Sequence, residues 1–264
     1  RPLVVDLSAL WAGPLCAHLL GLAGARVIKV ESTGRPDGAR GGPAAFYDLL
    51  NAGKESVALD FRNTDHLRVL ERLIERADVV VEASRPRALE QLGIDAEHVV
   101  RSRPGLVWVS ITGYGRDEPM RNWCAFGDDA AAAGGLVAGS TDRPLFCSDA
   151  IADPLTGMHA AAAAVAAWRT GRACLLDVAM ARVAAYVAAF DTQPQSVGGG
   201  RNVPAKENEY DARRAGAEPP EAGQPTRVAV ARPRARKPAG RARPMGVDTK
   251  AIARELEQAG VRRC

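Results

Sequence analysis

Apolar and polar residues alternate in blocks over the first 190 positions of the chain, and the block lengths suit strands and helices. Short runs rich in Val, Ile and Leu are typical of buried strands, and longer segments with Leu and Ala at helical spacing lie between them. The pattern therefore predicts strands at residues 2–8, 26–31, 56–61, 78–84 and 106–115 and from residue 174, with helices at residues 12–25, 66–77, 87–93 and 96–104.

Local signals mark where several of these helices begin. Pro14 suits the first turn of the first helix. The run Asn63-Thr64-Asp65 can cap the helix that follows it. Residues 128–139 are rich in Ala and Gly, so we expect a helix there with another element packed closely against it. A long Ala-rich helix is predicted to start close to Asp153.

Repeated alternation of strands and helices predicts an α/β fold with an open, Rossmann-like, doubly wound and mostly parallel sheet. Ligands bind such sheets at the carboxyl ends of the strands. The loops that would gather at that edge follow Val30, Asp60, Glu82, Thr112 and Asp149.

The character of the chain changes after Phe190, where a long stretch has almost no apolar residues. Such composition is typical of a linker. Residues 227–231 could add one edge strand, and residues 248–260 form a helical pattern capped by Asp248 or Thr249. We expect a large domain at 1–190, a polar and basic linker or reduced second domain at 191–243, and a C-terminal helix at 244–264 that returns to the large domain.

Charge is unevenly divided along the chain. The net charge is +4, but residues 197–264 hold 15 Lys and Arg against 8 Asp and Glu, which leaves the rest of the chain mildly acidic. A basic tail can bind nucleic acid or can simply be solvated surface. Tyr210 is the one aromatic residue among these cations, so the tail has no series of rings to stack on bases. We therefore expect no nucleic-acid partner.

Cysteine and histidine spacing points away from metal sites and disulfides. The five Cys include no C-x-x-C pair, and none of the four His lies four positions from another. Reduced thiols are typical of the cytosol. The sequence has no uncharged apolar run of bilayer length and no signal peptide at its first residues. We expect a soluble cytoplasmic protein without a metal or a membrane partner.

Familiar nucleotide motifs are missing from the first strand-to-helix turn. The turn reads SALWAGPL, which is neither G-x-G-x-x-G nor a P-loop. The free N–H groups of a helix that begins at Ala12, Gly13 and Pro14 can still bind an anion. Lys54, at the entrance to a strand, could reach a phosphate or could be a solvated turn residue. Arg85, next to a Pro, could bind a phosphate or could be a charged surface residue.

Asp153 stands out because it lies between an apolar pair and the long Ala-rich helix. An Asp in that place is usually an N-terminal cap. A carboxylate among glycines can also be a nucleophile, because glycine lets substrate and backbone approach closely. Gly134, Gly135 and Gly157 are the glycines that would permit this approach.

Four stretches, in order, resemble the class III CoA-transferase family, which also contains carnitine-CoA transferases, formyl-CoA transferases and α-methylacyl-CoA racemases. The similarity runs from Leu3 to about Val187 and resumes at residues 240–260. The stretches are VVDLSALWAGPLCAHLLGLAGARVIKVE, then LNAGKESVALDF with ADVVVEASRPRALEQLG, then PGLVWVSITGYG, and finally DAIADPLTGMHAAAAAVAAWRTGRACLLDVAM.

The resemblance implies a Rossmann-like large domain and an interlocked homodimer. It also implies that one aspartate attacks the acyl-CoA thioester, forming a mixed anhydride and then an enzyme–CoA thioester, and this aspartate falls on Asp153. Nearby N–H groups would keep that carboxylate ionised. The acyl end would lie near Asp128 and Asp129. The implied residues of the CoA site are Ala12, Gly13, Pro14, Lys54 and Arg85, with Arg40 and Tyr114 as further candidates.

Three features depart from the family pattern. The segment that would carry the racemase histidine, CAFGDDAAAAGG, contains none, and His159 is interpreted as a packing residue. Glu55 follows Lys54 where a basic residue is usual, and Arg35 is a candidate to replace a missing arginine after the second strand. The polar stretch at 191–243 stands where the family has a second, smaller domain.

The sequence therefore predicts an acyl-CoA transferase that moves CoA between an acyl-CoA and a carboxylic acid through Asp153. Coenzyme A is its cosubstrate, and the expected assembly is a homodimer or a complex with a partner subunit. A non-catalytic subunit that binds CoA or acyl-CoA is the alternative. An acyl-CoA racemase is disfavoured by the missing histidine.

Overall fold

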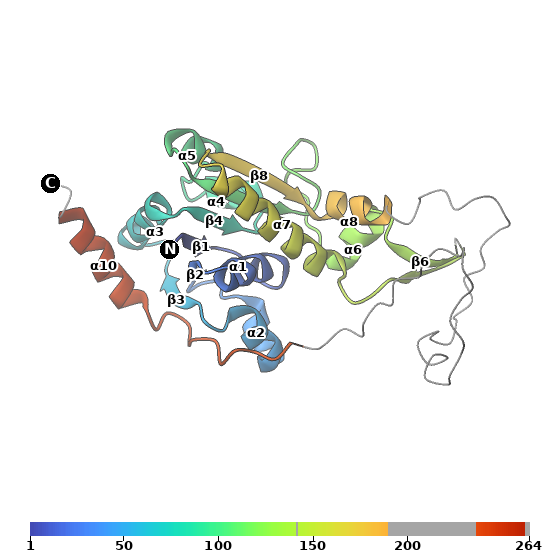
Figure 1. Ribbon diagram of the computed structural model, residues 1–264, viewed down its shortest axis with the longest axis horizontal. Coiled ribbons are helices and arrows are strands. Elements are labelled where there is room, and N and C mark those ends of the chain that lie inside the picture. Colours follow the sequence, from blue (N-terminus) through green and yellow to red (C-terminus); the bar gives the residue numbers. More distant parts are fainter. Residues whose placement is uncertain (141, 190–235, 262–264) are drawn as a thin grey trace, which may run out of the picture.

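The computed structural model describes residues 1–140, 142–189 and 236–261 (Figure 1). Its centre is a parallel sheet of six strands in the order β3-β2-β1-β4-β5-β8. The strands match the six apolar runs predicted from the sequence. Their bounds are β1 Leu3–Asp6, β2 Arg26–Ser32, β3 Glu55–Leu59, β4 Val79–Glu82, β5 Val107–Thr112 and β8 Cys174–Ala179.

The strand order reverses direction between β1 and β4, which confirms the Rossmann-like, doubly wound fold. β1 pairs with β2 on one side and with β4 on the other, so that Val4 faces Val27 and Val79 in register. The chain then builds β2 and β3 outward in one direction and β4, β5 and β8 in the other. A crevice opens at such a reversal, beyond the carboxyl ends of the strands.

Helices cover both faces of the sheet (Figure 1). One face is packed by α1, α6, α7 and α8, and the other by α3, α4, α5 and α10. The helices are α1 Ala12–Leu22, α2 Ala44–Asn51, α3 Thr64–Arg76, α4 Pro86–Glu90, α5 Ala96–Ser102, α6 Gly127–Ala133, α7 Ala152–Arg169, α8 Met180–Ala189 and α10 Thr249–Val261, with a 3-10 turn η1 at Gly38–Gly41.

Neighbouring residues of a strand belong to opposite halves of the core, because successive side chains point to opposite faces of a sheet. Val4 packs toward α1 and α7, whereas Val5 packs toward α3. Trp108 of β5 is fully buried in the second half. Since both faces are covered, the strands read as continuous apolar runs and not as alternating ones.

The C-terminal segment closes the free edge of the sheet at β3. The Ser56 N–H donates to the Asp248 carboxylate (2.8 Å), and the Ala58 N–H donates to the Thr249 hydroxyl (3.0 Å). Ile252 and Leu256 of α10 are buried in the same core half as α3. Asp248 and Thr249, which the sequence predicts as helix caps, satisfy polar groups of an edge strand.

The sequence prediction of a helix over residues 128–139 is wrong in its second half. Helix α6 ends at Ala133, and a two-stranded hairpin follows, with β6 at Val137–Ser140 and β7 at Arg143–Phe146. Gly134 and Gly135 end the helix, and Gly135 takes a left-handed φ of +82°. The strands of this hairpin are exposed on both sides, and Figure 1 shows it projecting from the body.

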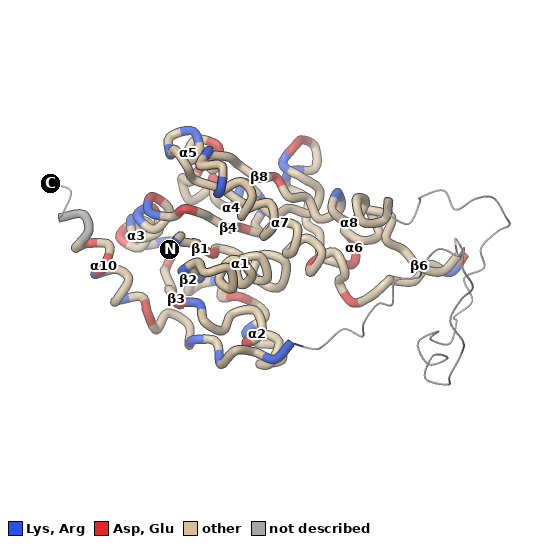
Figure 2. Tube along the Cα trace, viewed as in Figure 1, with Lys and Arg blue, Asp and Glu red and all other residues tan. Residues whose placement is uncertain are grey.

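Charged residues are frequent along α3, whereas α1 has none and α7 has only Asp153 and Arg169 (Figure 2). No helix among the described residues is long and apolar enough to span a membrane. The predicted edge strand at residues 227–231 and most of the 191–243 segment lie outside the described residues. The domain limits proposed from the sequence therefore stay a prediction.

Candidate active site

A cleft of about 630 Å³ lies at the carboxyl edge of the sheet, where the sequence places the ligand site. Its walls include residues that directly follow the strands, among them Ser8 after β1, Ser84 after β4 and Gly113 after β5. β1 and β4 flank the reversal in strand order, and β5 lies next to β4. Asp153, at the start of α7, lines the same cleft.

The Asp153 carboxylate is held by backbone N–H groups from two other helices. Its Oδ1 accepts a hydrogen bond from the Ala12 N–H at 3.3 Å, and the Gly127 N–H is a second donor. Ala12 begins α1 and Gly127 begins α6, so three helix N-termini meet at one carboxylate. The positive ends of helix dipoles favour a negative charge at this point.

Glycine is required at position 127 by this arrangement. A Cβ at Gly127 would lie 2.3 Å from Asp153 Oδ2 and 2.4 Å from the Ala150 carbonyl oxygen. Both distances are far inside van der Waals contact, so any side chain would displace the carboxylate or the turn that precedes α7.

Asp153 does not cap its own helix. Helix α7 begins at Ala152, and no side chain caps it. The carboxylate turns away to Ala12, so the capping interpretation is replaced by a contact between α7 and α1. Asp128 instead supports this junction, because its Oδ1 accepts the Ala150 N–H at 2.8 Å.

Burial raises the pKa of Asp153 to about 6, although the N–H groups of Ala12 and Gly127 lower it. The nearby carboxylates of Asp128 and Asp129 raise the pKa further. Desolvation thus outweighs the effect of these two N–H groups on the pKa of Asp153. At neutral pH and above, Asp153 is still mostly an anion.

Arg85 is the predicted phosphate ligand that the structure brings to the cleft. It is half-buried, precedes Pro86 at the start of α4, and makes no hydrogen bond or ion pair through its guanidinium within the described part of the chain. Arg35, proposed as a replacement cation, lines the same cleft and is exposed. The cleft thus presents free positive charge on its walls.

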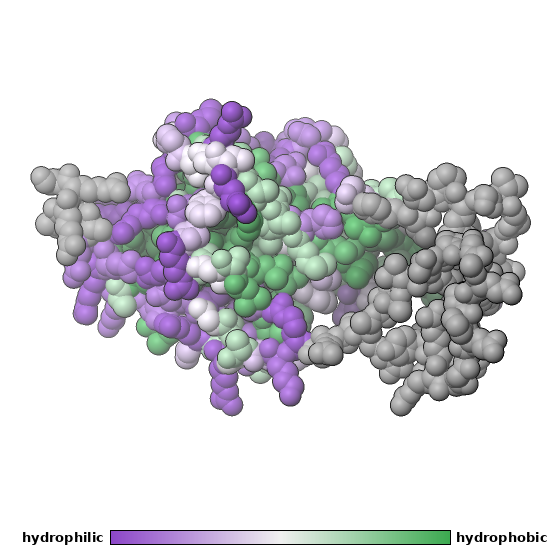
Figure 3. All heavy atoms as spheres, in the orientation of Figure 1, coloured by the Kyte–Doolittle hydropathy of each residue, from purple (hydrophilic) through white to green (hydrophobic). Residues whose placement is uncertain are grey.

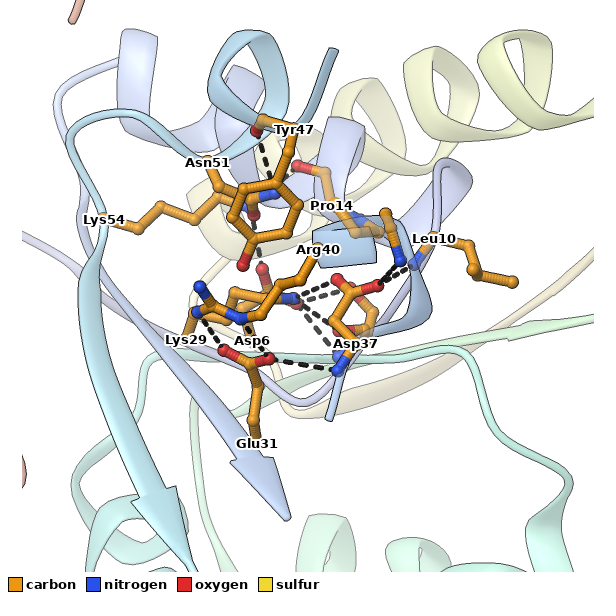
Figure 4. Close-up of polar contacts among 12 residues, drawn as sticks. Asp6, Leu10, Pro14, Lys29, Glu31, Asp37, Arg40, Tyr47, Asn51 and Lys54 are labelled. Atoms are coloured by element: carbon orange, nitrogen blue, oxygen red, sulfur yellow. Dashed lines mark hydrogen bonds and ion pairs between the residues drawn. The ribbon is translucent and has the colours of Figure 1, made fainter. Parts of the chain in front are cut away.

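Lys54 lies outside the cleft, and it is neither a solvated turn residue nor a free phosphate ligand. The side chain is buried, and its ammonium bonds to Asp6 Oδ2 (2.8 Å), the Pro14 carbonyl (2.9 Å) and Asn51 Oδ1 (3.1 Å) (Figure 4). An ammonium has three N–H donors, and all three are used. Lys54 therefore ties β1 and α1 to α2.

Arg40 and Tyr114 are likewise engaged elsewhere. The Arg40 guanidinium pairs with Glu31 through two hydrogen bonds and stacks 4.7 Å over the Tyr47 ring. Tyr114 packs edge-on against Trp123, with ring centroids 5.9 Å apart. Trp123 lines the cleft, whereas Tyr114 is not among the lining residues.

Most of the predicted glycines serve helix packing. A Cβ at Gly157 would lie 2.7 Å from the Ala12 carbonyl oxygen, and one at Gly134 would lie 2.6 Å from the Ala181 carbonyl oxygen. A Cβ at Gly13 would lie 2.2 Å from the Ser8 Cβ, and the Pro14 carbonyl oxygen accepts a hydrogen bond from the Lys54 ammonium. Neither residue lines the cleft. Gly135 faces open space and also lies outside the cleft lining.

Several cleft residues were missed by the sequence reasoning. The loop between β5 and α6 supplies Trp123, Cys124, Ala125 and Phe126, and no local motif announces it. Asp37, also in the lining, pairs with buried Lys29 of β2 at 2.9 Å. A charged residue inside an apolar strand, such as Lys29, needs a buried partner, and this was the available signal in the sequence for a residue such as Asp37.

His159 lies on α7 and is absent from the cleft lining. Its Nδ1 contacts the Leu155 carbonyl oxygen of the preceding turn, and its ring packs edge-on against Tyr186. These contacts agree with the packing role expected from the sequence. No histidine lines the cleft within the described ranges.

The sequence model of CoA-transferase family III matches residues 3–228. A succinyl-CoA–D-citramalate CoA-transferase of Chloroflexus aurantiacus is 32% identical over 196 residues, which cover 67% of this chain and 49% of that protein. A formyl-CoA:oxalate CoA-transferase of Escherichia coli is 34% identical over 166 residues, which cover 59% of this chain and 40% of that protein. The chain spans half or less of the length of these curated relatives.

Two solved structures have a similar fold. A CAIB/BAIF family protein from Brucella suis aligns with a TM-score of 0.67 at 30% identity, covering 76% of this chain and 58% of its own. A hypothetical protein from Mycobacterium tuberculosis aligns with a TM-score of 0.66 at 32% identity, covering 72% of this chain and 57% of its own.

Proposed function

This chain belongs to CoA-transferase family III, and we propose that it is an acyl-CoA transferase in which Asp153 is the nucleophile. The observation that carries the proposal is the position of Asp153, whose carboxylate lines the cleft and receives the N–H groups of Ala12 and Gly127. The proposed cosubstrates are an acyl-CoA and a carboxylic acid.

In the first proposed step, a carboxylate oxygen of Asp153 attacks the carbonyl carbon of the thioester. The C–S bond breaks, and CoA leaves as a thiolate with the electron pair. The product on the enzyme is a mixed anhydride of Asp153 and the acyl group. Partial burial favours this attack, because a carboxylate stripped of water is a stronger nucleophile.

In the second proposed step, the CoA thiolate attacks the Asp153 carbonyl carbon and releases the first acid as a carboxylate. This forms an enzyme–CoA thioester. The acceptor carboxylate then attacks that thioester, expels the thiolate and forms a new anhydride. The thiolate attacks the acyl carbon of this anhydride, which yields the new acyl-CoA and regenerates Asp153. No net proton is gained or lost.

The backbone donors around Asp153 can stabilise negative charge at two stages of this cycle, in the free carboxylate and during attack on the Asp153 carbonyl. The N–H groups of Ala12 and Gly127 point at the position where negative charge lies in the free enzyme. During attack on the Asp153 carbonyl, charge develops on the same oxygens. Donors fixed in advance at such a position cost no reorganisation during the reaction.

We propose that the CoA phosphates lie near Arg85 and Arg35, the unpaired cations of the cleft wall. Arg121 also lines the cleft, but it is already paired with Glu90 at 2.5 Å. Planar guanidinium groups suit phosphate oxygens because they donate two parallel hydrogen bonds. Lys54 is not part of this proposal.

The named substrates of the relatives suggest the chemical class of the acids. The relatives transfer CoA between succinate and citramalate, or between formate and oxalate, according to their names. We propose small carboxylic acids as donors and acceptors for this chain. An exchange assay tests this: the purified protein should move label from a free carboxylic acid into its CoA ester, and failure with every acid of a panel would contradict transfer.

We also propose that the chain acts as a homodimer. The β6–β7 hairpin leaves Leu145 and Phe146 63% and 64% exposed, and an isolated two-stranded hairpin is marginally stable in water. Apolar residues also gather over α1, α6 and α7 (Figure 3), where Met158 and Trp168 are exposed. Sedimentation should give twice the mass of the chain, and a monomer at all concentrations would contradict this assembly.

The non-catalytic alternative stays a prediction, as does the cytoplasmic location. A CoA-binding subunit would bind acyl-CoA at the same cleft without forming a covalent adduct. A racemase is disfavoured, because the part of the cleft described by the structure has no histidine to exchange an α-proton. The exchange assay separates these possibilities, since only a transferase moves label between free acid and thioester.

A further inference from the structure

The turn that carries the Ala12 N–H has an unusual backbone shape. Leu10, two residues before Ala12, takes a left-handed φ of +70°. A residue with a branched apolar side chain rarely adopts this region without surrounding contacts that impose it. The conformation is therefore held by something outside the turn.

Asp37 is the residue that holds it. Asp37 Oδ1 accepts the Leu10 N–H at 3.0 Å and the Ala39 N–H at 3.0 Å (Figure 4). The carboxylate lies in the cleft lining and is almost fully buried. One oxygen atom thus joins the turn between β1 and α1 to the loop between β2 and η1.

Asp37 is itself fixed by groups on β2 and η1. Its Oδ2 lies 2.9 Å from the Lys29 ammonium, and its N–H donates to Glu31 Oε1 at 3.1 Å. Glu31 in turn pairs with Arg40 of η1. Burial works against ionisation of Asp37, but Lys29 and the Leu10 and Ala39 N–H groups hold its pKa below the ordinary value.

We propose that Asp37 is a positioning residue for the nucleophile: by holding Leu10, it keeps the Ala12 N–H directed at Asp153. The connection is short and continuous, from Asp37 Oδ1 to the Leu10 N–H, along the backbone to Ala12, and across to Asp153 Oδ1. The proposal rests on the proposed function only in calling Asp153 the nucleophile.

If Asp37 positions the Ala12 N–H, then a change at Asp37 also changes the pKa of Asp153. A purely structural role for Asp37 would leave that pKa unchanged. The charged groups that face Asp153 are the carboxylates of Asp128 and Asp129 on α6, and both disfavour its anion. The Ala12 N–H is one of the two donors that oppose them. If the turn relaxes and this donor is lost, the pKa of Asp153 must rise.

The test compares two variants of equal charge, one with and one without a side-chain oxygen that can accept the Leu10 N–H. Both carry Lys29→Met, which avoids leaving a buried ammonium unpaired. One adds Asp37→Asn, which keeps an oxygen that can accept the Leu10 N–H, and the other adds Asp37→Ala, which removes it. The Asp153 pKa is read by NMR titration of ¹³C-labelled aspartate carboxyls in the full chain, with the signal assigned by its loss in Asp153→Asn.

We expect the Asp153 pKa of the Asp37→Ala variant to lie about one unit above that of the Asp37→Asn variant. Equal Asp153 pKa values in the two variants would overturn the proposal. Asp248→Asn is the matched control, because Asp248 also accepts a backbone N–H, from Ser56, at the distant β3 edge. It should leave the Asp153 pKa unchanged.

A second measurement uses the unaltered protein and covers the case in which the Asp37→Ala variant does not fold. The Ala12 amide proton should shift with the same midpoint as the Asp153 carboxyl, and the Leu10 amide should exchange slowly with solvent. An Ala12 amide that ignores the Asp153 titration, or a fast Leu10 amide, would overturn the proposal. None of these readouts needs turnover, so failure of the proposed transferase activity is seen separately.

Discussion

The Ala12 N–H donates to Asp153 Oδ1 at 3.3 Å, although the two residues lie 141 positions apart in the chain. The contact joins the first turn of α1 to the first turn of α7, and the sheet reversal between β1 and β4 is what brings these turns to one edge. The chemistry proposed for the chain depends on this meeting point.

The first prediction concerns the pH dependence of the reaction. Asp153 must be an anion to attack, and burial raises its pKa to about 6. The value of kcat/KM for an acyl-CoA should therefore fall about tenfold for each pH unit below that point. Initial rates between about pH 4.5 and 8 measure this limb. A midpoint near 4, where an ordinary aspartate titrates, would contradict the account.

The second prediction concerns stability and its sign. The folded pKa of Asp153 lies above its unfolded value of 3.8, so the fold favours the neutral acid. Stability is therefore lost as the pH rises from 3.8 through about 6, by up to about 3 kcal/mol. Asp153→Asn should be more stable than the wild type at about pH 8 but not at about pH 4.

Urea unfolding at the two pH values measures this difference. Asp65→Asn is a suitable control, because Asp65 is on the exposed surface of α3. An Asp153→Asn variant whose advantage is the same at both pH values would show that charge burial is not the cause.

The third prediction concerns Gly127. Because a Cβ there would lie 2.3 Å from Asp153 Oδ2, Gly127→Ala should displace the carboxylate. We expect a loss of roughly 100-fold in kcat, the effect of a displacement of about 1 Å in a catalytic group. Gly240→Ala is the control, since its Cβ would meet nothing within 4 Å. Full activity of Gly127→Ala would count against the geometry.

The fourth prediction concerns recognition of CoA. Removing the unpaired cation at the cleft wall by Arg85→Gln should raise KM for acyl-CoA by about 10-fold or more, with a smaller effect on kcat, because charge-assisted hydrogen bonds to phosphate are strong. Arg68→Gln removes the same charge from the exposed surface of α3 and should change neither constant. Equal KM values for the two variants would remove Arg85 from the site.

The sequence predicted the sheet because its strands are rich in Val, Ile and Leu, as β4 illustrates with three consecutive valines, all buried. Asp153 stands out because the junction it occupies is visible in the sequence, and its proposed role as nucleophile comes from the resemblance to the family. Its partners were not predicted, because Ala12 and Gly127 contribute only backbone N–H groups.

Charged residues inside the fold were the main failure. Lys54 follows a turn in the sequence, where exposure is usual, yet it is buried against Asp6 of β1. Such a pairing depends on which strand is adjacent in space, and a single sequence does not contain that information. The same holds for Asp37, whose contact with Leu10 joins two loops.

The most direct test of the central claim is the intact mass of the protein after incubation with a panel of acyl-CoAs, with Asp153→Asn as the control. The account predicts a covalent CoA adduct on the wild type that hydroxylamine removes and that is absent from Asp153→Asn. An adduct of the same occupancy on Asp153→Asn, or no adduct on a wild type that binds acyl-CoA, would contradict the role of Asp153 as nucleophile.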